Sequence, residues 1–148
     1  MDAKEKQVLV TLLATILTLV LYSMYIYNMY ISSDPAIINS FRFWGNAFII
    51  LIPVAIVAQI IVQIIFAIIN RIVTNEDIPT KDDERDRLIE LKTIRISHWI
   101  FITGFTLAMG SQSMGMQPWV MFVTLFSSGF ISSIVSEISR FLYYRRGF

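Results

Sequence analysis

The chain has 148 residues, of which 55% are hydrophobic and 16% are charged, and its formal net charge is +1. This hydrophobic share exceeds that of a typical soluble domain, and the small net charge gives no support to nucleic-acid binding. The sequence contains no cysteine, which excludes disulfides, thiolate chemistry and cysteine-based metal sites.

The apolar residues gather in uncharged runs of about 20 residues, the length that crosses roughly 30 Å of hydrocarbon. The sequence therefore predicts an all-α membrane protein in contact with the lipid bilayer, built as one transmembrane domain (1–148) of four helices in an antiparallel bundle. We read the first run as a retained anchor, because it is longer than the apolar part of a signal peptide. The predicted helices are 8–31, 43–70, 96–116 and 119–144, and residues 71–95 form a charged connector.

In the first segment, Thr11, Thr15, Thr18 and Tyr22 recur at helical spacing and share one face. This face is either a polar lining or a packing seam, and a seam is the commoner use of small hydroxyl side chains between membrane helices. We favour the seam.

The second segment follows residues 32–35, which have the serine, aspartate and proline typical of a helix start. Pro53 lies inside this segment and predicts a kink. Gln59, Gln63 and Asn70 fall on one face, and amides at membrane depth must face protein or water. They either join two helices or contact a substrate, and we favour the first interpretation.

The connector contains most of the acids in the chain. Thr80 followed by Asp83 resembles a capping box, so we expect a helix that starts near Lys81 and continues without a break into the third segment. Charged residues and an apolar strip of Leu88, Ile89 and Leu91 are typical of a helix face that lies on a membrane surface or on a partner. The candidate partner surface consists of Asp83, Glu84, Arg87, Leu88 and Leu91.

The third and fourth segments contain small residues at helical spacing. Gly104 and Ala108 form one pair, and Ser128, Ser132 and Ser136 lie along one stripe. Small residues at this spacing let two membrane helices approach closely. They are the strongest helix-packing signal in the chain.

Basic residues predict the orientation. They lie before the first segment, throughout the connector and at the end of the fourth segment, whereas Arg42 is the only base between the first two segments. By the positive-inside rule, both termini and the connector are cytoplasmic.

Glu137 is the only acid inside the last segment, and His98 is the only histidine in the chain. Both fall near the predicted cytoplasmic surface, where they could relay protons or bind a cation. The alternative is an ion pair of Glu137 with Arg140, Arg95 or His98 that holds two helices together, and we favour it. The candidate polar membrane site comprises Gln59, Gln63, His98, Glu137 and Arg140.

No other pattern indicates chemistry. A single histidine and no cysteine leave only a carboxylate cluster as a metal site, and that cluster lacks the spacing of a calcium loop. Motifs for a nucleophilic serine or a phosphate-binding glycine loop are absent from the sequence. We therefore expect no enzyme, no cofactor and no bound metal.

The connector sequence 83–92, DERDRLIELK, and the tail 144–147, YRRG, resemble a family of small uncharacterised bacterial four-helix membrane proteins. That family combines a D-E-R-D-x-x-I-x-x-K connector with a Y-R-R-G tail. The resemblance implies a bacterial inner membrane and a four-helix bundle. It implies no activity, so it assigns no functional residue.

These observations lead to a first functional hypothesis, a non-enzymatic membrane protein that acts through protein contacts as a regulatory, sensory or accessory subunit. We expect homo-oligomers or a membrane or cytoplasmic protein partner. The second hypothesis is a small channel or transporter for protons, cations or metabolites. Its predicted lining is Gln59, Gln63, Thr103, Thr106, Ser132 and Glu137. The sequence does not separate the first hypothesis from immunity to a membrane-active toxin.

Overall fold

The structure is a computed structural model that describes residues 1–79 and 83–147. Its four long helices are α1 (Ala3–Ile26), α2 (Phe41–Thr74), α3 (Glu84–Ser113) and α4 (Pro118–Arg146). A π-helical turn, η1 (Tyr27–Ile31), and a 3₁₀ turn, η2 (Pro35–Asn39), lie between α1 and α2. The described chain is thus helical throughout apart from turns and short loops, and this confirms the all-α, four-helix prediction.

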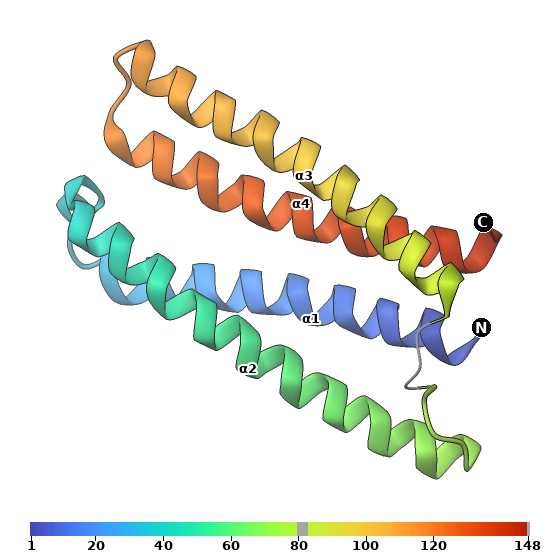
Figure 1. The fold of residues 1–148 in the computed structure, drawn as a ribbon. Helices are drawn as coiled ribbons and strands as arrows, with labels where there is room; N and C mark the ends of the chain where they lie inside the picture. Colours follow the sequence, from blue (N-terminus) through green and yellow to red (C-terminus); the bar gives the residue numbers. More distant parts are fainter. Residues whose placement is uncertain (80–82, 148) are drawn as a thin grey trace.

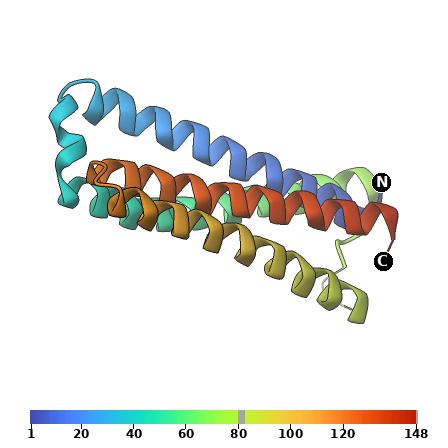
Figure 2. The same ribbon diagram turned by 90° about the horizontal axis from the view of Figure 1, so that it is seen from above.

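The helices form two hairpins, α1–α2 and α3–α4 (Figure 1). The turns of both hairpins lie at one end of the bundle, and both termini lie at the other end, where α2 ends and α3 begins. Helix α1 packs against α2 and α4, and α3 packs against α4. The contact between α1 and α4 therefore joins the two hairpins, which Figure 2 shows from above.

Three helical segments among the described residues, Ala3–Ile31, Phe41–Thr74 and Pro118–Arg146, are long and apolar enough to cross a membrane. Large apolar side chains cover their outer surfaces, and Ile72 and Val73 of α2 are 73% and 75% exposed. Contiguous apolar surface of this extent, on helices long enough to span a bilayer, is typical of contact with lipid. The chain is a multi-pass membrane protein. Helix α3 does not reach the same apolarity, because its first three turns are charged and the rest of the helix contains His98 and ends in the polar sequence Gly-Ser-Gln-Ser.

The predicted helix start at residues 32–35 begins η2 rather than α2. The side chain of Asp34 accepts a hydrogen bond from the backbone of Ala36, with Pro35 at the first position, but this turn ends at Asn39. Ser40 then caps α2 by accepting a hydrogen bond from the backbone N–H of Phe43 at 3.4 Å. Two capping side chains follow each other here, and the sequence pattern identified only the first.

The start of α3 differs from the prediction by three residues. Asp83 is the N-cap, and it exchanges hydrogen bonds with Asp86 in a capping box, at 2.8 Å and 3.3 Å. The predicted box paired Thr80 with Asp83, and Thr80 and Lys81 lie outside the described residues. The expected continuity holds, because α3 runs without a break from Glu84 to Ser113.

Helices α3 and α4 pack through the small residues that the sequence singled out. A β-carbon added to Gly104 would overlap the side chain of Ser128. Ala108 is completely buried, and Ser128 and Ser132 are buried on the α4 side. The prediction of a close contact through these residues is confirmed.

The hairpin α1–α2 is joined to α4 by aromatic side chains near the turns. The hydroxyl of Tyr22 donates a hydrogen bond to the backbone oxygen of Ala47 at 2.6 Å. Trp44 of α2 stacks on Phe122 of α4 with ring centres 5.6 Å apart. Toward the end with the termini, α2 and α4 diverge (Figure 1). This divergence leaves room for polar side chains between the hairpins.

Candidate functional site

A partly open cavity of about 910 Å³ lies between the hairpins at the end that carries the termini. Side chains from all four helices line it, and most of them are polar or charged. They include Lys4, Gln7, Thr11 and Thr15 of α1, Gln59 and Gln63 of α2, Asp86 and Glu90 of α3, and Ser133, Glu137, Arg140 and Tyr144 of α4. This set is called the polar cavity below.

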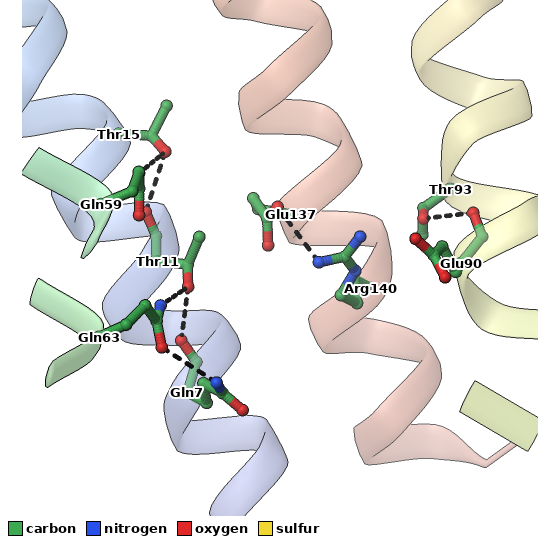
Figure 3. Close-up of polar contacts among 9 residues, drawn as sticks. All are labelled: Gln7, Thr11, Thr15, Gln59, Gln63, Glu90, Thr93, Glu137 and Arg140. Atoms are coloured by element: carbon green, nitrogen blue, oxygen red, sulfur yellow. Dashed lines mark hydrogen bonds and ion pairs between the residues drawn. The ribbon is translucent and has the colours of Figure 1, made fainter. Parts of the chain in front are cut away.

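One wall of the polar cavity is a ladder of hydrogen bonds between α1 and α2 (Figure 3). The amide of Gln63 donates to the hydroxyl of Thr11 at 2.6 Å and accepts from the amide of Gln7 at 3.0 Å. One turn further along, the amide of Gln59 donates to the hydroxyl of Thr15 at 2.9 Å. The two glutamines therefore join helices, as the packing interpretation predicts, and they also face the cavity.

Asn70 does not belong to this ladder, although it shares the predicted face. Its amide donates to the backbone oxygen of Glu76 at 3.1 Å, beyond the end of α2. Asn75 adopts a left-handed conformation at this end, with φ of 56°, which ends the helix. Asn70 therefore holds the chain that leaves α2, and among the described residues no hydrogen bond joins its side chain to α1.

Glu137 projects from α4 on the side of α1, opposite the ladder (Figure 3). Its Oε1 pairs with the guanidinium of Arg140 at 3.5 Å, which is one of the three partners that the sequence proposed. The other oxygen, Oε2, is buried and accepts no hydrogen bond from any described residue. A buried carboxylate oxygen without a donor is costly, so this atom is a strong candidate for a ligand contact.

A second charged cluster closes the end of the cavity. Asp86 is buried, pairs with the ammonium group of Lys4, and accepts a hydrogen bond from the hydroxyl of Tyr144 at 2.8 Å. Burial raises the pKa of the Asp86 carboxyl, but the hydrogen bonds from Lys4, Tyr144 and the backbone of Asp83 lower it by more. The pKa therefore lies below its ordinary value of 3.8. This cluster ties the N-terminus, α3 and the end of α4 together.

The polar lining stops about halfway along the bundle. The next cavity, of about 860 Å³, shares only Thr15, Gln59 and Ser133 with the polar cavity. Beyond these residues its described walls are aromatic and aliphatic except for Thr18, and they include Phe48 and Phe126, whose rings are 5.7 Å apart. From the end that carries the termini toward the middle of the bundle, the lining thus changes from mostly polar to mostly apolar.

His98 lies apart from this site. It is exposed on α3, and within residues 1–79 and 83–147 it forms no ion pair with Glu137. Arg95, the other proposed partner on α3, is also exposed. Among the described residues, His98 does not line the polar cavity that contains Glu137.

Three of the residues predicted to line a channel also lie elsewhere. Thr103 and Thr106 are exposed on α3 and bond to their own helix, at the backbone oxygens of Trp99 and Ile102. Ser132 is buried and bonds to the backbone oxygen of Gly129. Only Gln59, Gln63 and Glu137 of that set line the polar cavity.

The candidate partner surface divides into three environments. Asp83 caps the helix, and Ile89, which the sequence grouped with the leucines, is fully buried. Glu84 and Arg87 are exposed. Leu88 and Leu91 are 48% and 64% exposed on the outer face of α3.

Sequence reasoning missed Gln7, Asp86 and Tyr144 as members of the polar site. Gln7 had a usable signal, because it precedes Thr11 and Thr15 at four-residue spacing. Tyr144 had none, since its contact with Asp86 joins residues 58 positions apart.

Comparison of the chain with family models, with curated proteins and with solved structures finds no match.

Proposed function

We propose that all four helices cross the membrane and that both termini and the α2–α3 connector are cytoplasmic. Helix α3 lies alongside α4 in both views, and α4 is itself apolar enough to span (Figures 1 and 2). Of the 12 lysines and arginines, only Arg42, in the first turn of α2, lies at the opposite end beside the hairpin turns. The positive-inside rule and the resemblance to bacterial four-helix proteins both support a bacterial inner membrane.

We propose further that the protein acts without catalysis, through contacts with another protein at its cytoplasmic end. The observation that carries this proposal is the outer face of the first turns of α3. Glu84, Leu88, Leu91 and Arg95 recur at intervals of four, three and four residues, and all four side chains are exposed. This is the spacing of a helix seam that packs against another helix.

In the proposed topology this face lies on the cytoplasmic side of the apolar part of α3, so hydrocarbon does not cover its leucines. Two exposed leucines between an acid and a base form an amphipathic surface of the kind that binds a helix. We name Glu84, Leu88, Leu91 and Arg95 the α3 seam.

A second copy of the chain does not suit the α3 seam. Two copies with the same orientation in one membrane would place their α3 helices parallel, with Glu84 near Glu84 and Arg95 near Arg95. Like charges at matched positions are unfavourable. The seam instead suits an amphipathic helix of a cytoplasmic protein that carries a base beside Glu84 and an acid beside Arg95.

Site-specific photo-crosslinking in cells tests this proposal. A benzoylphenylalanine at Leu88 or Leu91 should form an adduct with another protein. The same probe at Leu107, which lies on the same helix and is as exposed as Leu91 at 64%, should form none. The double charge reversal Glu84→Lys with Arg95→Glu should abolish the adduct. Three outcomes would contradict the proposal. The adduct could persist after the charge reversal, it could have the mass of two copies of the chain, or it could contain only lipid.

The channel or transporter hypothesis has one observation in its favour, which is the polar cavity with the buried Oε2 of Glu137. Beyond Thr15, Gln59 and Ser133, however, Thr18 is the one polar side chain in the described lining of the next cavity. A charged solute moving further would therefore lose most of its polar partners beside Phe48 and Phe126. This geometry supports binding at one end of the bundle better than passage through it.

A further inference from the structure

We propose that the polar cavity binds a small organic cation whose protonated amine donates a hydrogen bond to Glu137. The site is separate from the α3 seam, and the proposal does not depend on a protein partner. It rests on three features of the cavity: an acceptor without a donor, an excess of acid, and a facing wall of amides and hydroxyls.

The acceptor is Oε2 of Glu137. It is buried, and within the described chain no side chain donates to it. Arg140 reaches the other oxygen, Oε1, at 3.5 Å, so the pair with Arg140 leaves Oε2 available. A ligand N–H at this position would satisfy the carboxylate, and a positive charge on that nitrogen would strengthen the bond.

The charges around the cavity favour a cation. Its lining contains three acids, Asp86, Glu90 and Glu137, and two bases, Lys4 and Arg140. Each base is already paired, Lys4 with Asp86 and Arg140 with Glu137. A cation therefore adds the charge that balances the site, whereas an anion would meet acids in excess.

The wall across from Glu137 can hold the rest of such a ligand. The hydroxyls of Thr11 and Thr15 donate to the backbone oxygens of Gln7 and Thr11, and they accept from Gln63 and Gln59. Each of these amides has two N–H groups, and the ladder uses one of them. The wall thus offers further donors and acceptors to a polar ligand, facing Glu137 (Figure 3).

A metal ion fits these residues less well than an amine. Among the described residues no group of three or more histidine, aspartate, glutamate or cysteine side chains is placed to hold one. Glu137 already pairs with the guanidinium of Arg140, and the side chains that face it across the cavity are neutral amides and hydroxyls. Divalent metals require several such anionic or oxygen ligands together.

The test is thermal unfolding of the full chain in detergent. Circular dichroism monitors the unfolding, with and without added n-propylammonium chloride. Ligands that bind only the folded protein raise its melting temperature in a saturable way. We expect this rise with n-propylammonium, and none with potassium chloride, tetramethylammonium chloride or n-propanol at equal concentration. An equal rise with tetramethylammonium or potassium would overturn the proposal, because neither offers an N–H, and so would no rise at all.

Two variants assign the effect to the cavity. Glu137→Gln should abolish the rise, whereas Glu76→Gln, the same change at an exposed loop residue, should keep it in full. If Glu137→Gln does not fold, Ser133→Leu replaces it in the test. The leucine side chain fills part of the cavity and leaves every charge in place, so this variant should also abolish the rise in melting temperature. A rise that persists in Glu137→Gln or in Ser133→Leu would overturn the proposal.

Discussion

Replacing Gly104 with alanine should weaken the contact between α3 and α4. The new β-carbon would overlap both the Oγ and the Cβ of Ser128, while the Cα of Ser128 would lie at 3.5 Å, an ordinary contact distance. Rotation of the serine moves only its Oγ, so the overlap with Cβ forces the two helices apart. Overpacking of this kind costs about 1 to 3 kcal/mol.

Gly110→Ala is the matched control for this experiment. Gly110 lies in the same helix, and a β-carbon added there meets nothing within 4 Å. Alanine at an open helical position is better than glycine by up to about 1 kcal/mol. The same substitution, six residues apart in α3, should therefore destabilise at Gly104 and leave stability unchanged or raise it at Gly110.

Denaturant unfolding in mixed micelles, followed by circular dichroism, measures both variants. The double variant Gly104→Ala with Ser128→Gly adds a stricter test, because only the Cα at 3.5 Å then faces the new methyl group. We expect this pair to show a favourable coupling of at least about 1 kcal/mol in a double-mutant cycle. Equal effects of the two single alanine substitutions, or additive effects in the cycle, would refute the close approach.

Three further predictions concern polar contacts. Tyr22→Phe removes the buried hydrogen bond to Ala47 and should lower the free energy of unfolding by about 0.5 to 1.5 kcal/mol in the same assay. Unchanged stability of this variant would contradict the hydrogen bond. Gln63→Leu should cost more than Gln59→Leu, because Gln63 makes two bonds to α1 and Gln59 makes one, and a reversed order would contradict the ladder. The pKa of Asp86 lies below 3.8 in the folded protein, so its stabilising contribution is present above that pH and is lost as the pH falls through the lower value. Unfolding free energies measured across this range should fall less steeply for Asp86→Asn than for the natural chain.

Apolar run length and the small-residue pattern were sufficient to predict the four helices and the closest contact between them. Each depends on residues that are near one another along one helix, such as Gly104 and Ala108. The same local reasoning identified Gln59 and Gln63 as partners of another helix. It could not say that the partner was α1, because both α1 and α4 present hydroxyl side chains at similar spacing.

The sequence did not predict which way each helix is rotated about its axis, nor which distant segments come into contact. Whether His98 reaches the cavity that Glu137 lines depends on the rotation of α3 about its axis, and the full burial of Ile89 and Thr93 fixes which face of α3 packs against its neighbours. The cluster of Lys4, Asp86 and Tyr144 likewise joins three segments, and no spacing within any one of them predicts it.

The position of the polar cavity follows from unequal packing of the two hairpins. Small residues let α3 approach α4 closely, whereas the aromatic rings of Trp44 and Phe48 hold α2 against α4 only near the turns. Away from these rings α2 diverges, and Gln59 and Gln63 bond to α1 in place of α4. Glu137 then faces a space that no described side chain fills with a donor, so the same packing that builds the bundle also creates the candidate ligand site.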